Sequence, residues 1–328
     1  MGSLKSIRLR SIVYQALLAA ALVLAAWYLI ANAVENLGQR RIASGFAFLA
    51  RESGFEIGES TFLSYNAADT YLRAISVGFL NTFRVAALAI VFSTLLGTLI
   101  GLARLSPNWL LAKLAAVYVE VIRNLPLVVQ LFFWYAVITE RLPVPVEALN
   151  PLPGVFLSNR GFAFPSLVAA TPLALDYPVL EGFNFSGGAL LSPEFVALFF
   201  GLTLYTAAFI AEIVRAGILA VARGQFEAAS SLGHSQWQVR RFIILPQALR
   251  VIVPPLTSQY LNTIKNSSLA VAIGYPDLVS IANTIINQTG QAIEGIAIIM
   301  LVYLTISLAI AGFMNRYNRR FALKGAEL

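Results

Sequence analysis

Long apolar runs divide the chain into segments of the length that a membrane span requires. Runs with few or no charges cover residues 12–31, 85–103, 114–139, 195–211, 251–275 and 295–315. About 20 consecutive apolar residues cross the hydrocarbon layer as a helix. The pattern therefore predicts an all-α membrane protein with six transmembrane helices.

The connections between these runs predict the organisation of the chain. Two polar segments, 34–75 and 140–194, fall on one side of the membrane if the N-terminus lies on the other. The complete prediction is a cytoplasmic leader and first span at 1–33, an extracytoplasmic loop at 34–75, the second and third spans at 76–139, an extracytoplasmic insertion at 140–194, the fourth span at 195–220, a cytoplasmic loop at 221–249, the fifth and sixth spans at 250–316, and a cytoplasmic tail at 317–328.

The insertion and the first span each leave an alternative open. The apolar stretch 164–175 of the insertion is short and contains Pro165 and Pro172. It should therefore pack on the outer surface, either in an elaborated loop without chemistry or in a docking surface for an outside partner. The first span could be a cleaved signal peptide, because a basic leader precedes it and Ala31-Asn32-Ala33 fits a cleavage site. Its 20-residue length favours a retained helix, since the apolar part of a signal peptide usually has about 7–15 residues.

Composition excludes a soluble protein. Apolar residues make up 58% of the chain and charged residues 12%, whereas soluble domains have about 45–50% and ~25%. The chain has no cysteine and a single histidine, His234. Disulfides and thiolate metal sites are therefore excluded, and a histidine-based catalytic or metal site is not expected.

The net charge of +7 follows the predicted topology and does not indicate a nucleic-acid surface. Basic residues concentrate in segments 1–11, 104–113, 215–250 and 316–328, and the only acids there are Glu227 and Glu327. Basic residues in short loops mark the cytoplasmic side, so both termini should be cytoplasmic. The basic residues that carry this prediction are Lys5, Arg8, Arg10, Arg104, Lys113, Arg215, Arg223, Arg240, Arg241, Arg250, Arg316, Arg319, Arg320 and Lys324.

The long cytoplasmic loop predicts two helices separated by a turn. Residues 225–232 are mostly good helix formers. Gly233 suits a left-handed helix stop, and Ser235 can cap the next helix. Pro246 then directs the chain back toward the membrane. These features alone fit either a helical knob or a solvated basic loop that only sets topology.

This loop resembles the EAA loop of ABC-importer membrane subunits. The matching positions are Glu227, Ala228, Ala229, Gly233, Ile243, Leu245 and Pro246. Segments 119–130, 208–217 and 266–269 resemble further stretches of the polar amino-acid permeases. The resemblance covers about residues 74–322, and the enlarged form is most similar to the general L-amino-acid permeases of the bacterial inner membrane.

The resemblance implies a type I ABC importer transmembrane fold with an extra N-terminal helix. It further implies a second, related but different permease chain, ATP-binding cassette ATPase subunits and an extracytoplasmic amino-acid-binding protein. Coupling to the ATPase would involve Glu227, Ala228, Ala229, Gly233 and Pro246. No G-x-x-x-x-G-K-[ST] stretch occurs in this chain. We therefore expect a non-catalytic subunit without a cofactor of its own, with ATP and Mg bound by the partner ATPase.

Polar groups within the predicted spans are candidates for the substrate pathway, since charges at membrane depth usually face protein or water. For Glu120 and Arg123, three residues apart, we favour a structural ion pair, and Glu212 and Arg215 have the same spacing. Arg84 could instead extend to the outer interface, and the polar groups near Lys265 could only join helices. The pathway candidates are Arg84, Tyr205, Glu212, Asn262, Lys265, Asn266, Ser267 and Ser268, with Thr206 on weaker grounds.

Two other functions remain open at this point. An ion-coupled secondary transporter would show inverted repeats with paired broken helices, and only the segment containing Gly274 and Pro276 is interrupted. A membrane scaffold or sensor would not need the EAA positions for transport.

Overall fold

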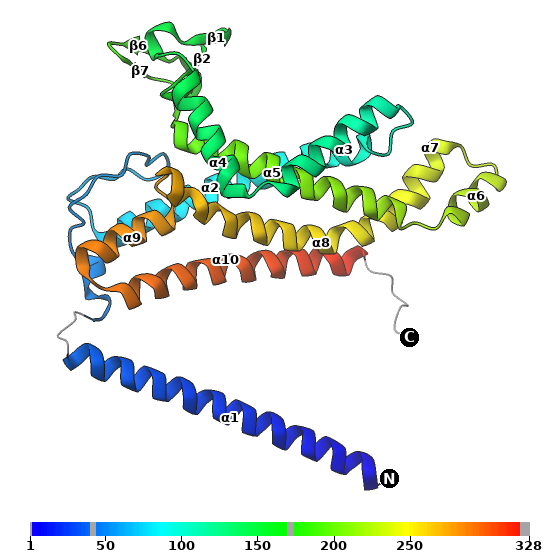
Figure 1. The fold of residues 1–328 in the computed structure, drawn as a ribbon, viewed down its shortest axis with the longest axis horizontal. Coiled ribbons are helices and arrows are strands. Elements are labelled where there is room, and N and C mark those ends of the chain that lie inside the picture. The colour runs from blue at the N-terminus through cyan, green and yellow to red at the C-terminus, as the bar shows by residue number, and fades with distance from the viewer. Residues whose placement is uncertain (1, 40–43, 169–173, 322–328) are drawn as a thin grey trace.

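The computed structural model describes residues 2–39, 44–168 and 174–321. Most of its long helices lie roughly along one axis (Figure 1). The helices α6 (Arg223–Ser231) and α7 (Gln236–Gln238) lie at one end, and α9 (Leu278–Thr289) lies at the other. Four helices are long and apolar enough to cross a membrane, and two bent helix pairs bring the total to as many as six. The four are α1 (Gly2–Gln39), α2 (Tyr71–Ala103), α5 (Pro193–Leu219) and α10 (Ala292–Phe321).

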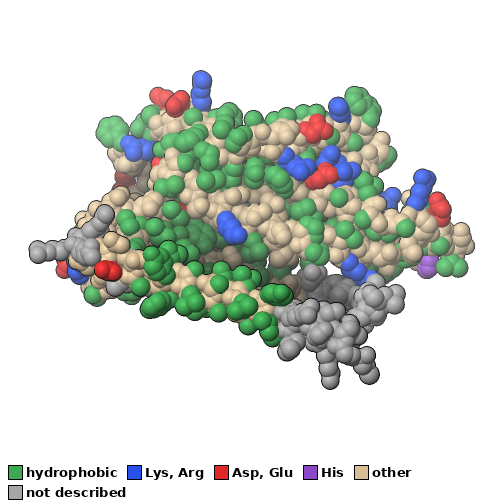
Figure 2. Space-filling model, turned by 60° about the horizontal axis from the view of Figure 1, so that its bottom comes forward, with side chains coloured by type: hydrophobic (Ala, Val, Ile, Leu, Met, Phe, Trp, Pro, Cys, Tyr) green, Lys and Arg blue, Asp and Glu red, His purple; other side chains and the backbone are tan. Residues whose placement is uncertain are grey.

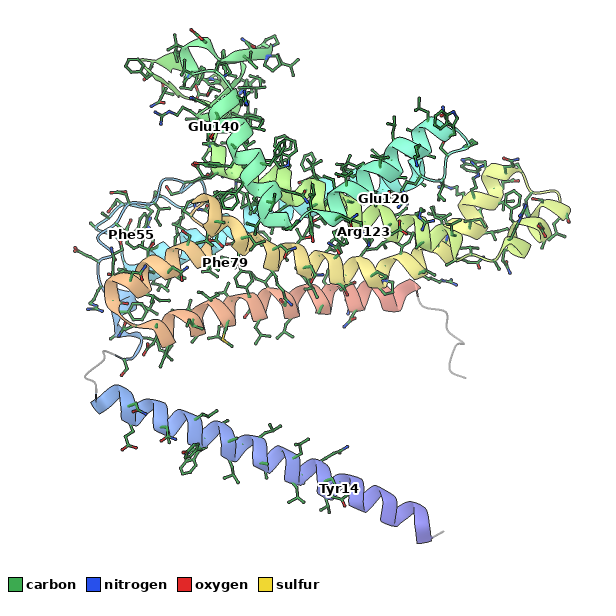
Figure 3. All side chains as sticks on the ribbon, in the orientation of Figure 1. Tyr14, Phe55, Phe79, Glu120, Arg123 and Glu140 are labelled. Atoms are coloured by element: carbon green, nitrogen blue, oxygen red, sulfur yellow. The ribbon has the colours of Figure 1, made fainter. Side chains whose placement is uncertain are left out.

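Helix α1 lies apart from the other helices (Figure 1). None of its residues 12–29 is buried, and hydrophobic side chains coat it in the space-filling view (Figure 2). Tyr14, for example, is 71% exposed and projects freely (Figure 3). A helix that is apolar on all sides is stable only in an apolar surrounding, such as lipid or the helices of another membrane chain.

The bundle is organised around the close packing of α2 against α5. Gly97 and Gly101 of α2 meet Ala207 and Ala211 of α5, where a Cβ on either glycine would lie 2.7 Å from an α5 backbone oxygen. Small residues at such contacts let transmembrane helices approach closely. Buried side chains of α4 (Leu127–Ala136), α5 and the 3-10 helix η5 (Ser267–Ile273) extend the same core.

The third predicted span is wrong as a single helix. The structure breaks it into α3 (Trp109–Asn124) and α4 (Leu127–Ala136), bent by 104°, and a π-helical turn η2 (Val137–Arg141) follows. Pro126 disfavours helical backbone at Leu125, which is extended. The Gln130 side chain donates hydrogen bonds to the carbonyls of Ile122 and Leu125 at 2.9 and 3.0 Å. These bonds give acceptors at the end of α3 a partner after the helix stops.

The fifth predicted span is interrupted where Gly274 and Pro276 indicated. Helix α8 (Leu245–Asn266) continues as the 3-10 helix η5 (Ser267–Ile273), and Gly274 ends it in the left-handed region. Asp277 then caps a further helix, α9 (Leu278–Thr289), bent by 53° from the preceding one. The sequence pattern did not separate α9 from its neighbours.

The all-α expectation is wrong for the insertion, which forms a small β lobe beyond the bundle (Figure 1). Four antiparallel strands pair in the order β1-β2-β3-β8, and two hairpins, β4–β5 and β6–β7, accompany them. Part of the stretch 164–175, residues 169–173, lies outside the described residues. The strands are β1 (Leu149–Leu152), β2 (Val155–Ser158), β3 (Gly161–Phe164), β4 (Ser166–Val168), β5 (Ala174–Asp176), β6 (Val179–Glu181), β7 (Asn184–Ser186) and β8 (Ala189–Leu191).

Short helices complete the connections. The outer loop contains η1 (Phe46–Ala50), and η3 (Pro145–Glu147) leads into the β lobe. Glu140 in η2 marks the base of that lobe (Figure 3). The described part of the outer loop, residues 44–70, and the β lobe both lie toward the end of the bundle opposite α6 and α7 (Figure 1).

Candidate functional site

The EAA positions form a helix, a tight turn and a second helix, as the sequence predicted. Helix α6 (Arg223–Ser231) is followed by its cap, Leu232, and then by Gly233, whose φ is +82°. The His234 amide donates to the Ala229 carbonyl at 3.2 Å, and the Gly233 amide donates to the Ser230 carbonyl at 3.0 Å. This pair of bonds is a Schellman motif, which favours glycine at the left-handed position. The turn direction therefore depends on Gly233.

The second half of this element starts at a double cap. Ser235 and Gln238 form a capping box at α7 (Gln236–Gln238), in which two otherwise free amides are satisfied. The chain continues through the π-helix η4 (Val239–Ile244) into α8, where Pro246 occupies the first turn. Because the backbone at Ile244 and Leu245 is already helical, Pro246 removes one amide hydrogen bond at the junction between the π-helix and α8.

The EAA side chains divide between an inner and an outer face of α6. Ala229 is buried at 4% exposure, whereas Glu227 and Ala228 are exposed. Glu227 pairs with Arg223 at 3.5 Å, but both side chains are mostly in solvent, where such pairs contribute little. The outer face thus offers a carboxylate beside a small residue to another protein.

A second candidate surface is a polar stripe on α8, formed by Ser258, Asn262 and Lys265. These residues are exposed and spaced by four and three, so they share one helix face. Within the described part of the chain, the Lys265 ammonium has no hydrogen-bond or ion-pair partner. A charged group is costly against lipid, so this face must border water or another protein chain.

The neighbouring serines predicted for the pathway bond to the backbone. Ser267 is buried and donates to the Ile264 carbonyl at 2.7 Å, and Ser268 donates to the Lys265 carbonyl at 2.7 Å. Asn266 is half-buried. Of the predicted set on this segment, Asn262 and Lys265 are therefore the most open.

The α5 candidates pack inside the chain. The Thr206 and Thr263 hydroxyls lie 3.1 Å apart and join α5 to α8. Tyr205 packs on the main core cluster, and its ring centre lies 4.9 Å from that of Phe209. Both residues stabilise helix packing in this structure.

Arg84 belongs to a buried network at the outer end of the bundle. Its guanidinium donates to Glu59 Oε1 at 2.6 Å and to Thr61 Oγ1 at 2.7 Å, and it lies 4.3 Å from the Phe195 ring centre. Ser192, which caps α5, donates to Glu59 Oε2 at 2.6 Å. Burial raises the pKa of the Glu59 carboxyl, while Ser192 and Arg84 act to lower it. These contacts account for Arg84 without a substrate.

A second network closes the opposite end of α5. Glu212 accepts hydrogen bonds from Arg215 at 2.6 and 3.1 Å, as the spacing suggested, and it also pairs with Arg104 of the α2 end. The sequence did not reveal Arg104 as a partner, because 108 residues separate it from Glu212. Glu212 is therefore held between two arginines.

The predicted Glu120–Arg123 ion pair does not form among the described side chains. Glu120 is exposed, and the Arg123 guanidinium lies 4.9 Å from the Phe209 ring centre. Figure 3 labels Glu120 and Arg123 on α3. Both residues line a cleft of about 380 Å³ together with Arg104 and Glu212. Electrostatic attraction to the aromatic ring gives the Arg123 guanidinium part of the stabilisation that an ion pair would provide.

Comparisons with known proteins agree on one kind of transporter. Residues 93–323 match the family described as "Binding-protein-dependent transport system inner membrane component". The "General L-amino acid transport system permease protein AapQ" of Rhizobium johnstonii is 43% identical, with 96% of this chain and 92% of the relative covered. The "Glutamate/glutamine/aspartate/asparagine transport system permease protein BztB" of Rhodobacter capsulatus is 36% identical, with 97% and 95% covered.

A solved structure extends the agreement to the fold. The chain superposes on a subunit of the "Crystal structure of an amino acid ABC transporter with histidines" with a TM-score of 0.57 and 28% identity. The superposition covers 76% of this chain and 95% of that one. A further match at 17% identity, to the MetNI methionine ABC transporter, shares the fold with a TM-score of 0.52.

Proposed function

This chain belongs to the family of binding-protein-dependent transport system inner membrane components, and from that premise we propose that it is the membrane subunit of an ATP-driven importer of L-amino acids. The observation that carries the proposal is the α6–α7 turn, with exposed Glu227 and Ala228 at one end of an apolar bundle. Relatives that cover almost the whole chain are named as amino-acid permeases. An ion-coupled secondary transporter is not supported.

In the proposed mechanism, α6 transmits closure of a separate ATPase subunit to the bundle. Ala228 permits close approach of the ATPase surface, and Glu227 offers a charge to a basic residue there. The chain α6–α7–η4–α8 is continuous, so a displacement of α6 moves α8 as a body. ATP and Mg are bound by the ATPase, and this subunit itself is non-catalytic.

The exposed α8 stripe supports a pathway shared with a second membrane subunit. Lys265 and Asn262 would line it, because neither can face lipid without cost. An amino acid carries a carboxylate that an ammonium group can bind. We assign the second subunit to a related but different permease chain, and delivery to an extracytoplasmic amino-acid-binding protein that contacts the β lobe.

The topology that fits this function has six spans, with each bent pair counted as one. The retained α1 would be an extra N-terminal helix, outside the shared fold. Both termini would be cytoplasmic, because the basic α6–α7 element and the end of α10 face the side of the ATPase. Side chains of several basic residues that support this orientation, including Lys5 and Arg319, lie outside the described residues.

Replacement of Gly233 tests the coupling element directly. Gly233→Val should reduce ATP-driven uptake about tenfold, because a β-branched residue at positive φ costs about 1–2 kcal/mol and reshapes the turn. Gly233→Asn should retain uptake, since asparagine tolerates this conformation. Uptake and amino-acid-stimulated ATP hydrolysis would be measured in vesicles that contain both permeases, the ATPase and the binding protein.

Equal activity of the valine variant would contradict the coupling assignment and favour a scaffold role for the loop. Within the described part of this chain, no atom beyond its sequence neighbours lies within 4 Å of a Cβ at Gly233. Because Gly233→Asn also adds a side chain, a loss confined to the valine variant reports the backbone conformation and not crowding.

Replacement of Lys265 tests the pathway. Lys265→Met should lower uptake by about ten- to a hundredfold, because a charged hydrogen bond to the substrate carboxylate is worth about 1.5–3 kcal/mol. Lys113→Met, which removes an exposed charge from α3, is the matched control and should transport normally. Unchanged uptake with Lys265→Met would exclude this residue from the pathway.

A further inference from the structure

A large apolar groove lies beside the coupling element and takes no part in the proposed transport steps. Its volume is about 930 Å³, within the range of small-molecule sites. Leu99 and Leu102 at the end of α2, together with Leu111 of α3, form one wall. Ile244 and Leu245, where η4 passes into α8, form the other.

Two arginines are part of the groove lining. Arg240 and Arg241 both line it and both are exposed. Neither has a carboxylate partner among the residues that the structure describes. The Arg241 guanidinium lies 5.3 Å from the ring centre of Trp237, which also lines the groove and is 62% exposed. The polar side of the groove therefore carries two positive charges beside an exposed indole.

The position of the groove at the end of α2 indicates the level at which a bilayer would change from hydrocarbon to headgroups. The apolar span of α2 ends at Ala103, itself part of the lining. Tryptophan concentrates at this level in membrane proteins, and Trp237 in the lining and Trp109 at the start of α3 are both highly exposed. An occupant must match an apolar interior and a cationic mouth at that depth.

We propose that this groove binds one anionic phospholipid of the leaflet on the α6–α7 side. Its acyl chain occupies the leucine-lined part, and its phosphate accepts hydrogen bonds from Arg240 and Arg241. Anionic headgroups are bound by basic pockets between transmembrane helices on the cytoplasmic side. Because η4 connects the coupling element to α8, the lipid also supports the position of that element against the end of α2.

The test uses the assembled transporter in lipid nanodiscs that contain equal amounts of phosphatidylglycerol and phosphatidylcholine. Native mass spectrometry counts the phospholipid that each complex retains after gentle extraction. The unmodified complex should retain phosphatidylglycerol selectively. Arg240→Gln and Arg241→Gln should each weaken retention about fivefold, and the double variant about thirtyfold, since each basic residue near an anionic lipid contributes a comparable factor.

Two variants separate the site from a general charge effect. Arg316→Gln removes an exposed charge near the end of α10 and should leave phosphatidylglycerol retention unchanged. Leu102→Trp fills the groove while both arginines remain, and it should abolish selective retention. Equal loss with Arg316→Gln would overturn the proposal, because the effect would then be non-specific.

The ATPase subunit is the competing occupant of the groove. If the double arginine variant loses the ATPase subunit but keeps its phosphatidylglycerol, the groove is a protein contact and the proposal is wrong. If phosphatidylglycerol is lost while the complex stays assembled, the lipid site is established. Uptake of amino acids is a separate readout, so failure of the lipid site leaves the transport function untouched.

Discussion

Replacing Gly97 by leucine should destabilise the chain by about 3 kcal/mol or more and lower its melting temperature by roughly 6–12 °C. The reason is the contact of α2 with α5. A Cβ at Gly97 would lie 2.7 Å from the Ala207 carbonyl oxygen and 2.7 Å from Ile210 Cβ. Neither atom is the end of a flexible side chain, so the helices themselves must separate.

The matched control is Gly312→Leu. Gly312 also lies in a transmembrane helix, α10, but a Cβ there meets nothing within 4 Å. Its leucine variant should therefore melt with the unmodified protein. Thermal unfolding in detergent, followed by size-exclusion fluorescence, would measure both variants. If the two shifted the melting temperature equally, the cause would be the loss of glycine and not the α2–α5 contact.

The sequence did not predict this packing of α2 against α5, but it did predict the apolar spans and the α6–α7 turn. Hydropathy located the apolar spans because a membrane imposes a length and a polarity on every crossing segment. The α6–α7 turn was predictable for a different reason. Its helix stop and cap depend on residues only a few positions apart, such as Gly233 and Ser235, whose conformational preferences are local.

The missed features depend on long-range contacts or on weak local signals. Pro126 was present in the sequence, but the summed length and hydropathy of residues 114–139 fitted a single span, which concealed the 104° bend between α3 and α4. The β lobe has strands of three or four residues, too short to show an alternating pattern. Its chain reversals rest on glycines such as Gly161, where a Cβ would lie 1.9 Å from the Leu191 oxygen.

The charged residues also divide into contacts that local spacing predicted and contacts that depend on residues far away in the sequence. Glu212 and Arg215 are neighbours on one helix, and their pairing followed from spacing. Arg84 was recognised as unusual, but its partner Glu59 lies in a loop 25 residues away. A lone carboxylate in a polar loop gives no sign that it will be buried. Glu120 and Arg123 had a favourable spacing, yet Arg123 lies over Phe209, which belongs to another helix.

Placing tryptophan at Ala228 should block the ATPase subunit while leaving this chain folded. Ala228 is exposed on the outer face of α6, whereas Ala229 beside it is buried against the chain. A bulky side chain at 228 therefore has room within the subunit and clashes only with a partner. Overpacking of a close contact costs about 1–3 kcal/mol, so ATPase-subunit affinity should fall by up to about a hundredfold.

Ala228→Ser serves as the conservative control, because it keeps the residue small and should bind the ATPase subunit within a few-fold of the unmodified chain. Binding would be measured by titrating the purified ATPase onto the permease pair in nanodiscs, with thermal unfolding as the check on folding. The tryptophan variant should melt normally, bind weakly and support little uptake. Normal ATPase binding by a folded Ala228→Trp chain would mean that the outer face of α6 is not the contact. The surface that transmits ATP-driven closure would then have to lie elsewhere on this end of the bundle.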